Sequence, residues 1–238
     1  MKKLLSSVAV MTLAFSTAGC AEAGDISKSQ IEQIVKDYLL ENPEIIREAL
    51  IALDAKEERQ AIAAVSDELF NDPRDVVIGP DDAKVTIVEF FDYNCGFCKN
   101  STEWVKTVME EHPDDVRFIF KELPVLDRRT KTSRYAAKAA LASARQGKYS
   151  KVHFALMQAR GLTRESIRDM VEEAGADMAK FDADMKDVAL DRQIEDTLAL
   201  SNRIPQLTGT PFFVINDDYV SGANVQRLDD LLAEALSS

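Results

Sequence analysis

Two cysteines lie at the junction between an apolar extended run and a helical pattern, and this junction constrains the fold more than any other feature. Residues 85–91 are rich in β-branched and aromatic side chains, which predicts a buried strand. Cys95 and Cys98 follow, residues 95–112 are typical of a helix, and residues 116–120 return to a strand pattern. A strand, a helix and a second strand of these lengths predict a right-handed parallel crossover, and hence an α/β fold.

The second half of the chain is expected to be helical before the sheet is completed. Residues 128–203 show only helical patterns, which predicts a helical subdomain inserted in the sheet. The apolar run 212–215, the turn at 216–218 and the short strand 219–220 then predict a closing hairpin, with a last helix over 225–236.

Residues 24–72 are expected to form a helical arm before a catalytic domain over residues 73–238. Ser27 and Gln30 predict a capping box at the start of the arm. The apolar face of the arm must be covered, and two alternatives are open: the arm packs on its own catalytic domain, or it pairs with the arms of other copies of the chain. Because the apolar spacing is heptad-like, although broken, we favour self-association through residues 26–70. Removal of that segment is expected to leave a folded domain.

The N-terminus has the pattern of a secretory signal peptide. Two lysines precede an apolar run over residues 4–15, which is shorter than the roughly 20 residues of a membrane-spanning helix. Cleavage after Ala23 removes residues 1–23. A bacterial lipoprotein signal over residues 1–19 would instead leave Cys20 acylated. Both alternatives remove Cys20 as a free thiol and place the protein in the periplasm, soluble or lipid-anchored.

Charge and composition narrow the class of protein. The formal net charge is -12 and no basic block is present, so nucleic acid is not an expected partner. The chain is 46% hydrophobic and 29% charged, which is typical of a packed globular protein.

The spacing of the cysteines predicts thiol-disulfide chemistry. Cys95 is expected at the start of a helix, where unpaired N–H groups and the helix dipole stabilise a thiolate, so it is the expected nucleophile. Cys98 lies one turn further on and is the expected resolving thiol, so Cys95 and Cys98 form a redox-active disulfide without a cofactor. Gly96 allows close approach of a substrate backbone, and Phe97 offers it an apolar contact.

Other uses of the cysteine pair fit the sequence less well. A zinc site needs two further ligands, and only His112 and His153 accompany the carboxylates. We expect no metal site, and we interpret both histidines and Trp104 as structural. Haem attachment needs a histidine after the second cysteine, where Lys99 stands.

The residues around the cysteines resemble a known family. Residues 90–99 (FFDYNCGFCK) and 208–213 (TGTPFF) are similar to the DsbA-like branch of the thioredoxin superfamily. The resemblance implies a thioredoxin-like fold with an inserted helical subdomain. It also implies that Pro211 is a cis-proline beside the active site, that Thr210 pairs with substrate backbone, and that Glu89 accepts the proton of the resolving cysteine.

Within that branch, the arm and the Cys-Gly-Phe-Cys motif most resemble the ScsC-type proteins of copper tolerance. The resemblance implies a disulfide isomerase or reductase that acts on exported cysteine-containing proteins, is kept reduced by a membrane thiol reductase of DsbD or ScsB type, and is oligomeric. Two alternatives stay open: a DsbA-like dithiol oxidase, and a redox protein that holds Cu(I) between the two thiolates.

Overall fold

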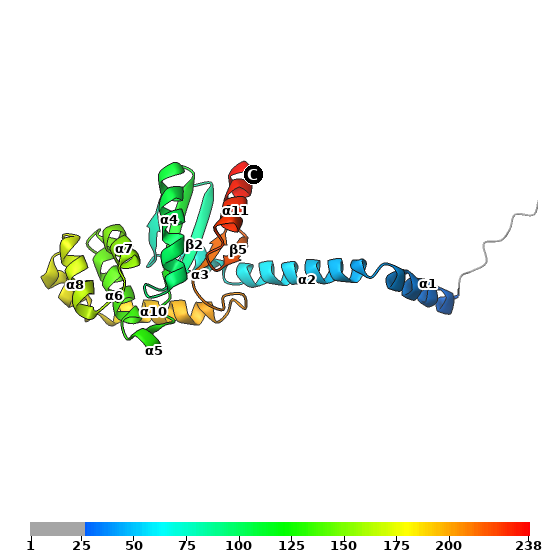
Figure 1. Ribbon diagram of the computed structural model, residues 1–238, viewed down its shortest axis with the longest axis horizontal. Coiled ribbons are helices and arrows are strands. Elements are labelled where there is room, and N and C mark those ends of the chain that lie inside the picture. The colour runs from blue at the N-terminus through cyan, green and yellow to red at the C-terminus, as the bar shows by residue number, and fades with distance from the viewer. Residues whose placement is uncertain (1–26) are drawn as a thin grey trace, which may run out of the picture. The chain divides into compact units, whose positions relative to one another are not determined.

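The computed structural model describes residues 27–238 (Figure 1). The expected signal segment, residues 1–23 or 1–19, and the expected lipidation site Cys20 lie outside the described residues. The chain divides into two compact units between Ile51 and Ala52, and each is described by itself. None of the helices in the described part of the chain is long and apolar enough to cross a membrane.

The first unit holds α1 (Lys28–Glu41) and the first part of α2 (Glu44–Ala63). The expected capping box is confirmed: Gln30 N donates to Ser27 Oγ at 3.3 Å, and Ser27 N donates to Gln30 Oε1 at 2.9 Å. No residue of α1 is buried. The large apolar side chains that the unit exposes are Ile31, Ile34, Val35, Tyr38, Leu40, Ile46, Leu50 and Ile51.

The second unit is built on a five-stranded sheet of order β1-β3-β2-β4-β5. Only β2 and β3 run parallel, and the other neighbours are antiparallel. The predicted parallel crossover and closing hairpin are therefore confirmed. The strands are β1 (Val76–Ile78), β2 (Val85–Phe91), β3 (Val116–Glu122), β4 (Phe212–Ile215) and β5 (Asp218–Ser221).

Helices surround this sheet (Figure 1). The crossover helix is α4 (Gly96–Glu111), and α11 (Val225–Ser237) follows the hairpin. Between β3 and β4 the chain is helical, in the region where the insertion was predicted. Its helices are α5 (Asp127–Thr130), α6 (Ser133–Ala144), α7 (Tyr149–Gln158), α8 (Arg164–Glu173), α9 (Met178–Asp184) and α10 (Val188–Ser201).

Alternate side chains of β2 pack in two separate hydrophobic cores. Ile87 and Phe91 belong to the larger core, which also takes residues from α4, from helices of the insertion and from α11. Val88 and Phe90 belong to a smaller core. Since successive side chains of a strand point to opposite faces, the two cores cover the two faces of the sheet.

The smaller core changes the expected domain boundary. Ile62 of α2, Val65 and Leu69 of α3 (Ser66–Phe70) are 2%, 3% and 0% exposed, and all three belong to this core with Phe90. The end of α2 and the whole of α3 are thus part of the catalytic unit, which begins at Ala52 rather than at residue 73. The expectation that removal of residues 26–70 leaves the domain intact is wrong, because that removal takes away part of the core.

Candidate active site

Cys95 occupies the N-cap position of α4, directly before the first helical residue. Its backbone is extended (φ -79°, ψ 118°), and its Sγ accepts a hydrogen bond from the N–H of Cys98 at 3.4 Å. Both cysteines are free thiols. The sulfur atom therefore caps the helix, the position at which unpaired N–H groups stabilise a negative charge.

The two thiols differ in acidity. The pKa of Cys95 is lowered to about 6, chiefly by a hydrogen bond from the Cys98 thiol, with further help from Thr210 and from the N–H groups of Cys98 and Phe97. Burial raises the pKa of Cys98, and the neighbouring Cys95 raises it further. At neutral pH the Cys95 thiol is mainly ionised and the Cys98 thiol is protonated. Cys95 is therefore suited to attack a disulfide, and Cys98 to act in a later step of the exchange.

The Thr210–Pro211 segment lies against the nucleophile, although it is distant in sequence. The Cys95 thiol donates to the Thr210 carbonyl oxygen at 3.1 Å, and the Thr210–Pro211 peptide bond is cis. Pro211 precedes β4, and its carbonyl oxygen accepts from Gly222 N at 2.8 Å. The structure thus brings together the two motifs that carry the family resemblance.

Glu89 is buried in the centre of β2, with 1% of its surface exposed. It lies between Phe120 of β3 and Phe213 of β4 in the sheet register. Neither of its carboxylate oxygens has a hydrogen-bond partner among the described residues. Burial, and to a lesser extent the charge of Cys95, raises its pKa to about 8. An acid of this kind exchanges a proton near neutral pH.

The residues between the two cysteines face outward. Phe97 is 67% exposed and Gly96 is also exposed. A Cβ atom added to Gly96 would meet no other atom within 4 Å. The surface formed by Gly96 and Phe97, next to Cys95, is therefore open to an incoming polypeptide.

Asp92, which the sequence did not single out, holds the loop before Cys95. Its Oδ1 accepts from Asn94 N at 2.8 Å and from Ser133 Oγ at 2.7 Å. Its Oδ2 accepts from Leu126 N at 2.8 Å. Asn94 in turn donates to Ser133 Oγ at 3.0 Å. The catalytic loop is thus tied to the first helices of the insertion.

A second buried network lies beside it. Tyr93 and Tyr149 both donate to Glu122 Oε1, at 2.8 and 3.0 Å, and the Tyr93 hydroxyl lies 3.0 Å from His153 Nδ1. Burial raises the pKa of the Glu122 carboxyl well above its usual range and lowers the pKa of His153 to about 3. His153 is a neutral core residue, as interpreted from the sequence.

The other residues considered from the sequence lie outside this constellation. His112 is the C-cap of α4, where its N–H donates to Val108 O. Trp104 is buried and donates to Asp229 of α11 at 2.7 Å. Within residues 27–238 there is no group of three or more His, Cys, Asp or Glu side chains that could hold a metal ion.

Sequence comparison agrees with this geometry. Residues 71–233 match the thioredoxin family. The chain belongs to this family. Residues 28–60 match a second family, described as the copper resistance protein ScsC N-terminal domain. The second match agrees with the resemblance of the arm to ScsC-type proteins.

Solved structures show the same relationship. ScsC from Proteus mirabilis in a transitional conformation is 30% identical, with a TM-score of 0.66 over 90% of this chain and 98% of that one. The thiol-disulfide exchange protein alpha-DsbA2 from Wolbachia pipientis is 28% identical, with a TM-score of 0.70 over 76% and 97%. A thioredoxin-like oxidoreductase from Silicibacter pomeroyi DSS-3 is 35% identical, with a TM-score of 0.65 over 72% and 98%. This chain shares the thioredoxin-like fold of these neighbours, which include a thiol-disulfide exchange protein and an oxidoreductase.

Among curated proteins the chain also matches part of several much longer proteins, which are named as Na(+)/H(+) antiporters. The Na(+)/H(+) antiporter NhaA of Herminiimonas arsenicoxydans is 29% identical over 162 residues, which are 68% of this chain and 25% of that protein. The chain therefore spans about a quarter of the length of the curated relatives that it matches.

Proposed function

We propose that this chain is a periplasmic disulfide isomerase or reductase of exported proteins, with Cys95 as nucleophile and Cys98 as resolving thiol. The observation that carries the proposal is the separation of the two thiol pKa values, with Cys95 lowered to about 6 and Cys98 raised. A thiolate that is present at neutral pH can attack a wrongly paired disulfide, while the protonated second thiol waits.

The first step is thiolate exchange. The Cys95 sulfur attacks one sulfur of a substrate disulfide, so the substrate S–S bond breaks and a bond between Cys95 and the substrate forms. The second substrate sulfur leaves as a thiolate. In isomerisation another substrate thiolate then attacks the mixed disulfide, and Cys95 is released unchanged.

Reduction requires the second thiol. When the Glu89 carboxyl is ionised it takes the proton of Cys98, and the Cys98 sulfur attacks the Cys95 sulfur, so the bond to substrate breaks and a Cys95–Cys98 disulfide forms. The substrate sulfur departs and takes a proton, and two electrons have passed from the dithiol to the substrate. A membrane thiol reductase of DsbD or ScsB type would return the pair to the dithiol.

The arm supports an assembled enzyme. Ile31, Val35, Leu40, Pro43 and Ile46 line an apolar hollow on the first unit. Three of these side chains, Ile31, Val35 and Leu40, are at least half exposed. Apolar surface of this kind is buried by association. Several catalytic units held around one substrate would favour isomerisation over a single exchange.

The proposal is tested by refolding a scrambled, multi-disulfide protein in a glutathione buffer. Residues 24–238 are compared with residues 52–238, which keep the whole catalytic unit but lack the first. Recovery by the longer chain that falls after truncation supports an assembled isomerase. Rapid oxidation of a reduced substrate, with no recovery of the scrambled one by either chain, would instead identify a dithiol oxidase.

Copper handling is a second candidate, favoured by the ScsC N-terminal match and by two free thiols at one helix end. Thiolate sulfur is a soft ligand that suits Cu(I). Titration with Cu(I) under anaerobic conditions tests it. Stoichiometric binding without any reduction of insulin disulfides would rank this function above thiol exchange.

A further inference from the structure

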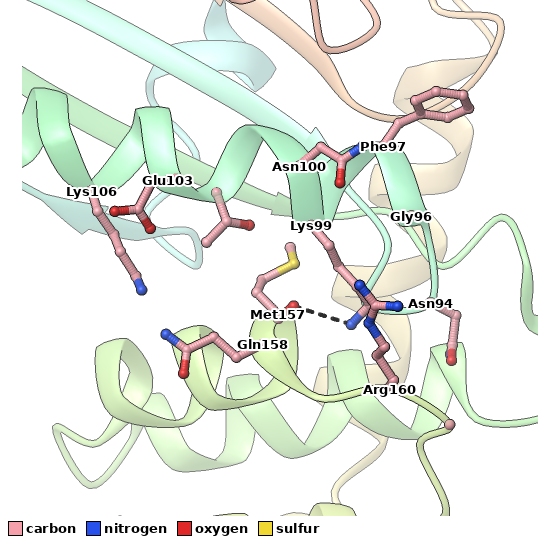
Figure 2. A pocket seen from close by; sticks show the side chains of 12 residues that line it. Asn94, Gly96, Phe97, Lys99, Asn100, Glu103, Lys106, Met157, Gln158 and Arg160 are labelled. Atoms are coloured by element: carbon pink, nitrogen blue, oxygen red, sulfur yellow. Dashed lines mark hydrogen bonds between the residues drawn. The ribbon is translucent and has the colours of Figure 1, made fainter.

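A pocket of about 700 Å³ opens beside the catalytic motif. One wall is the start of α4, and the other is the end of α7 with the loop that follows it (Figure 2). Asn94 and Gly96 line it, and these residues flank Cys95 in the chain. A polypeptide segment lying in the pocket would therefore continue directly to the nucleophile.

The charge of this pocket is opposite to that of the whole chain. Lys99, Lys106 and Arg160 line it, with Glu103 as the one acidic residue in the lining. The chain as a whole has a formal net charge of -12. A cationic surface on an acidic protein, placed next to the reacting sulfur, favours partners of the opposite sign.

One of these cations builds the pocket. Lys99 Nζ donates to the carbonyl oxygens of Leu156, Met157 and Ala159, at 2.9, 3.3 and 2.6 Å. These carbonyls are at the end of α7, so the ammonium group closes that helix and fixes the wall of the pocket against α4. Its three donors are occupied.

The other two cations are available to a ligand. Arg160 is exposed and, within the described residues, makes no hydrogen bond or ion pair. Lys106 Nζ lies 5.3 Å from the centre of the Phe154 ring and has no carboxylate partner in the same part of the chain. Figure 2 shows the side chain of Arg160 beside that of Lys99, and that of Lys106 further along α4.

We infer that this pocket is a subsite for an acidic segment of the protein that exchanges disulfides with Cys95. The inference rests on the proposed function and names a class of substrate for it. A guanidinium group pairs with a carboxylate through two parallel hydrogen bonds, and Arg160 is placed to do so next to the catalytic loop. The occupant is an extended polypeptide with Asp or Glu within a few residues of its reacting cysteine.

Matched disulfide-bonded peptides test this inference. One peptide carries two Glu residues beside its cysteine and its twin carries two Gln residues. The reduced protein, residues 24–238, passes two electrons from the dithiol to the peptide disulfide, and the rate is followed by stopped flow at low salt. We expect the Glu peptide to react about fivefold faster, the size of effect that exposed ion pairs give, and the difference to shrink in high salt.

Charge-removal variants locate the effect. R160Q, and more strongly R160Q combined with K106Q, should abolish the preference for the Glu peptide over the Gln peptide. R227Q removes the same charge from α11 at an exposed position outside the pocket and should preserve the preference.

The outcomes separate this inference from the proposed function. If neither peptide is reduced, the proposed function is wrong. If both are reduced at equal rates, the function stands and the subsite is refuted. If R160Q slows only the reaction with glutathione disulfide, the pocket serves a small acidic thiol and the inference of a polypeptide is overturned.

Discussion

The hydroxyl of Tyr93, which lies two residues before the nucleophile Cys95, donates a hydrogen bond of 2.8 Å to Glu122 Oε1 in the core. The same hydroxyl lies 3.0 Å from His153 Nδ1. The catalytic loop is therefore anchored by a polar group inside the core as well as by apolar packing. Because this network is buried, removing one member leaves its partners without a hydrogen bond.

Y93F should therefore destabilise the protein by about 1–3 kcal/mol, the cost of leaving buried polar groups unpaired. Urea denaturation followed by circular dichroism measures it. Y219F is the matched control, because its hydroxyl donates to Glu58 in a partly exposed setting and its loss should cost less. Equal losses in the two variants would contradict the importance of the buried network.

Alkylation of Cys95 should follow a titration with its midpoint near pH 6. The thiolate reacts, so the rate should rise as the pH is raised through about 6 and level off above it. In C98A the midpoint should move upward, because the Cys98 thiol is the largest cause of the lowered pKa. Iodoacetamide labelling followed by mass spectrometry gives both curves.

The reduction potential should fall between those of two reference proteins. A nucleophile pKa near 7 accompanies about -270 mV in thioredoxin, and one near 3.5 accompanies about -120 mV in DsbA. With Cys95 at about 6, we expect an intermediate value nearer to that of thioredoxin. Equilibration with glutathione at fixed ratios measures it, and a value as high as that of DsbA would favour the oxidase alternative.

Glu89 should make the stability of the protein depend on pH. Its pKa is raised from 4.5 to about 8 by folding, so the stabilisation is fully present below pH 4.5 and is lost as the pH rises through about 8. Each pKa unit corresponds to about 1.4 kcal/mol, so the loss amounts to several kcal/mol. E89Q should be the more stable protein at pH 8 and should show a flatter profile.

The same variant tests the proposed proton transfer. E89Q should slow release of substrate from the Cys95 mixed disulfide, since no carboxylate is left to take the proton of Cys98. Alkylation of Cys95 should change little. If both steps slow by the same factor, the substitution has disturbed the fold and the proton-acceptor role is not supported.

Two truncations should behave differently. Residues 52–238 retain Ile62, Val65 and Leu69 and should unfold at nearly the same denaturant concentration as residues 24–238. Residues 72–238 lack these three side chains, each of which contributes about 1.5–3 kcal/mol when buried, and should be destabilised by about 4 kcal/mol or more. Similar midpoints for both truncations would show that α3 is dispensable.

Much of the architecture could be predicted because local patterns of apolar and polar residues indicate the strands and helices. The strands around residues 85–91 and 212–215 are apolar runs, and the cysteine motif follows the first of them directly. The placement of Pro211 beside the active site came from the family resemblance, since no local pattern joins Cys95 to a segment more than 100 positions away, and the contact of Cys95 with Thr210 was not predicted.

The remainder depends on contacts that sequence spacing does not specify. Glu122 and His153 are 29 and 60 positions from Tyr93, and each is a polar residue in a stretch that gives no sign of their meeting. The burial of Ile62 was missed for a different reason: the apolar pattern of α2 looks the same on both sides of Ala52, although only the later part is covered by the sheet.

The insertion also sets the order in which the active site is completed. β4 pairs with β2 in the sheet but follows the entire helical insertion in the chain, so Thr210 emerges 115 residues after Cys95. Until β4 pairs with β2, Cys95 lacks its contact with the Thr210 carbonyl oxygen. The folding chain is thus itself a cysteine-bearing client before it becomes a catalyst.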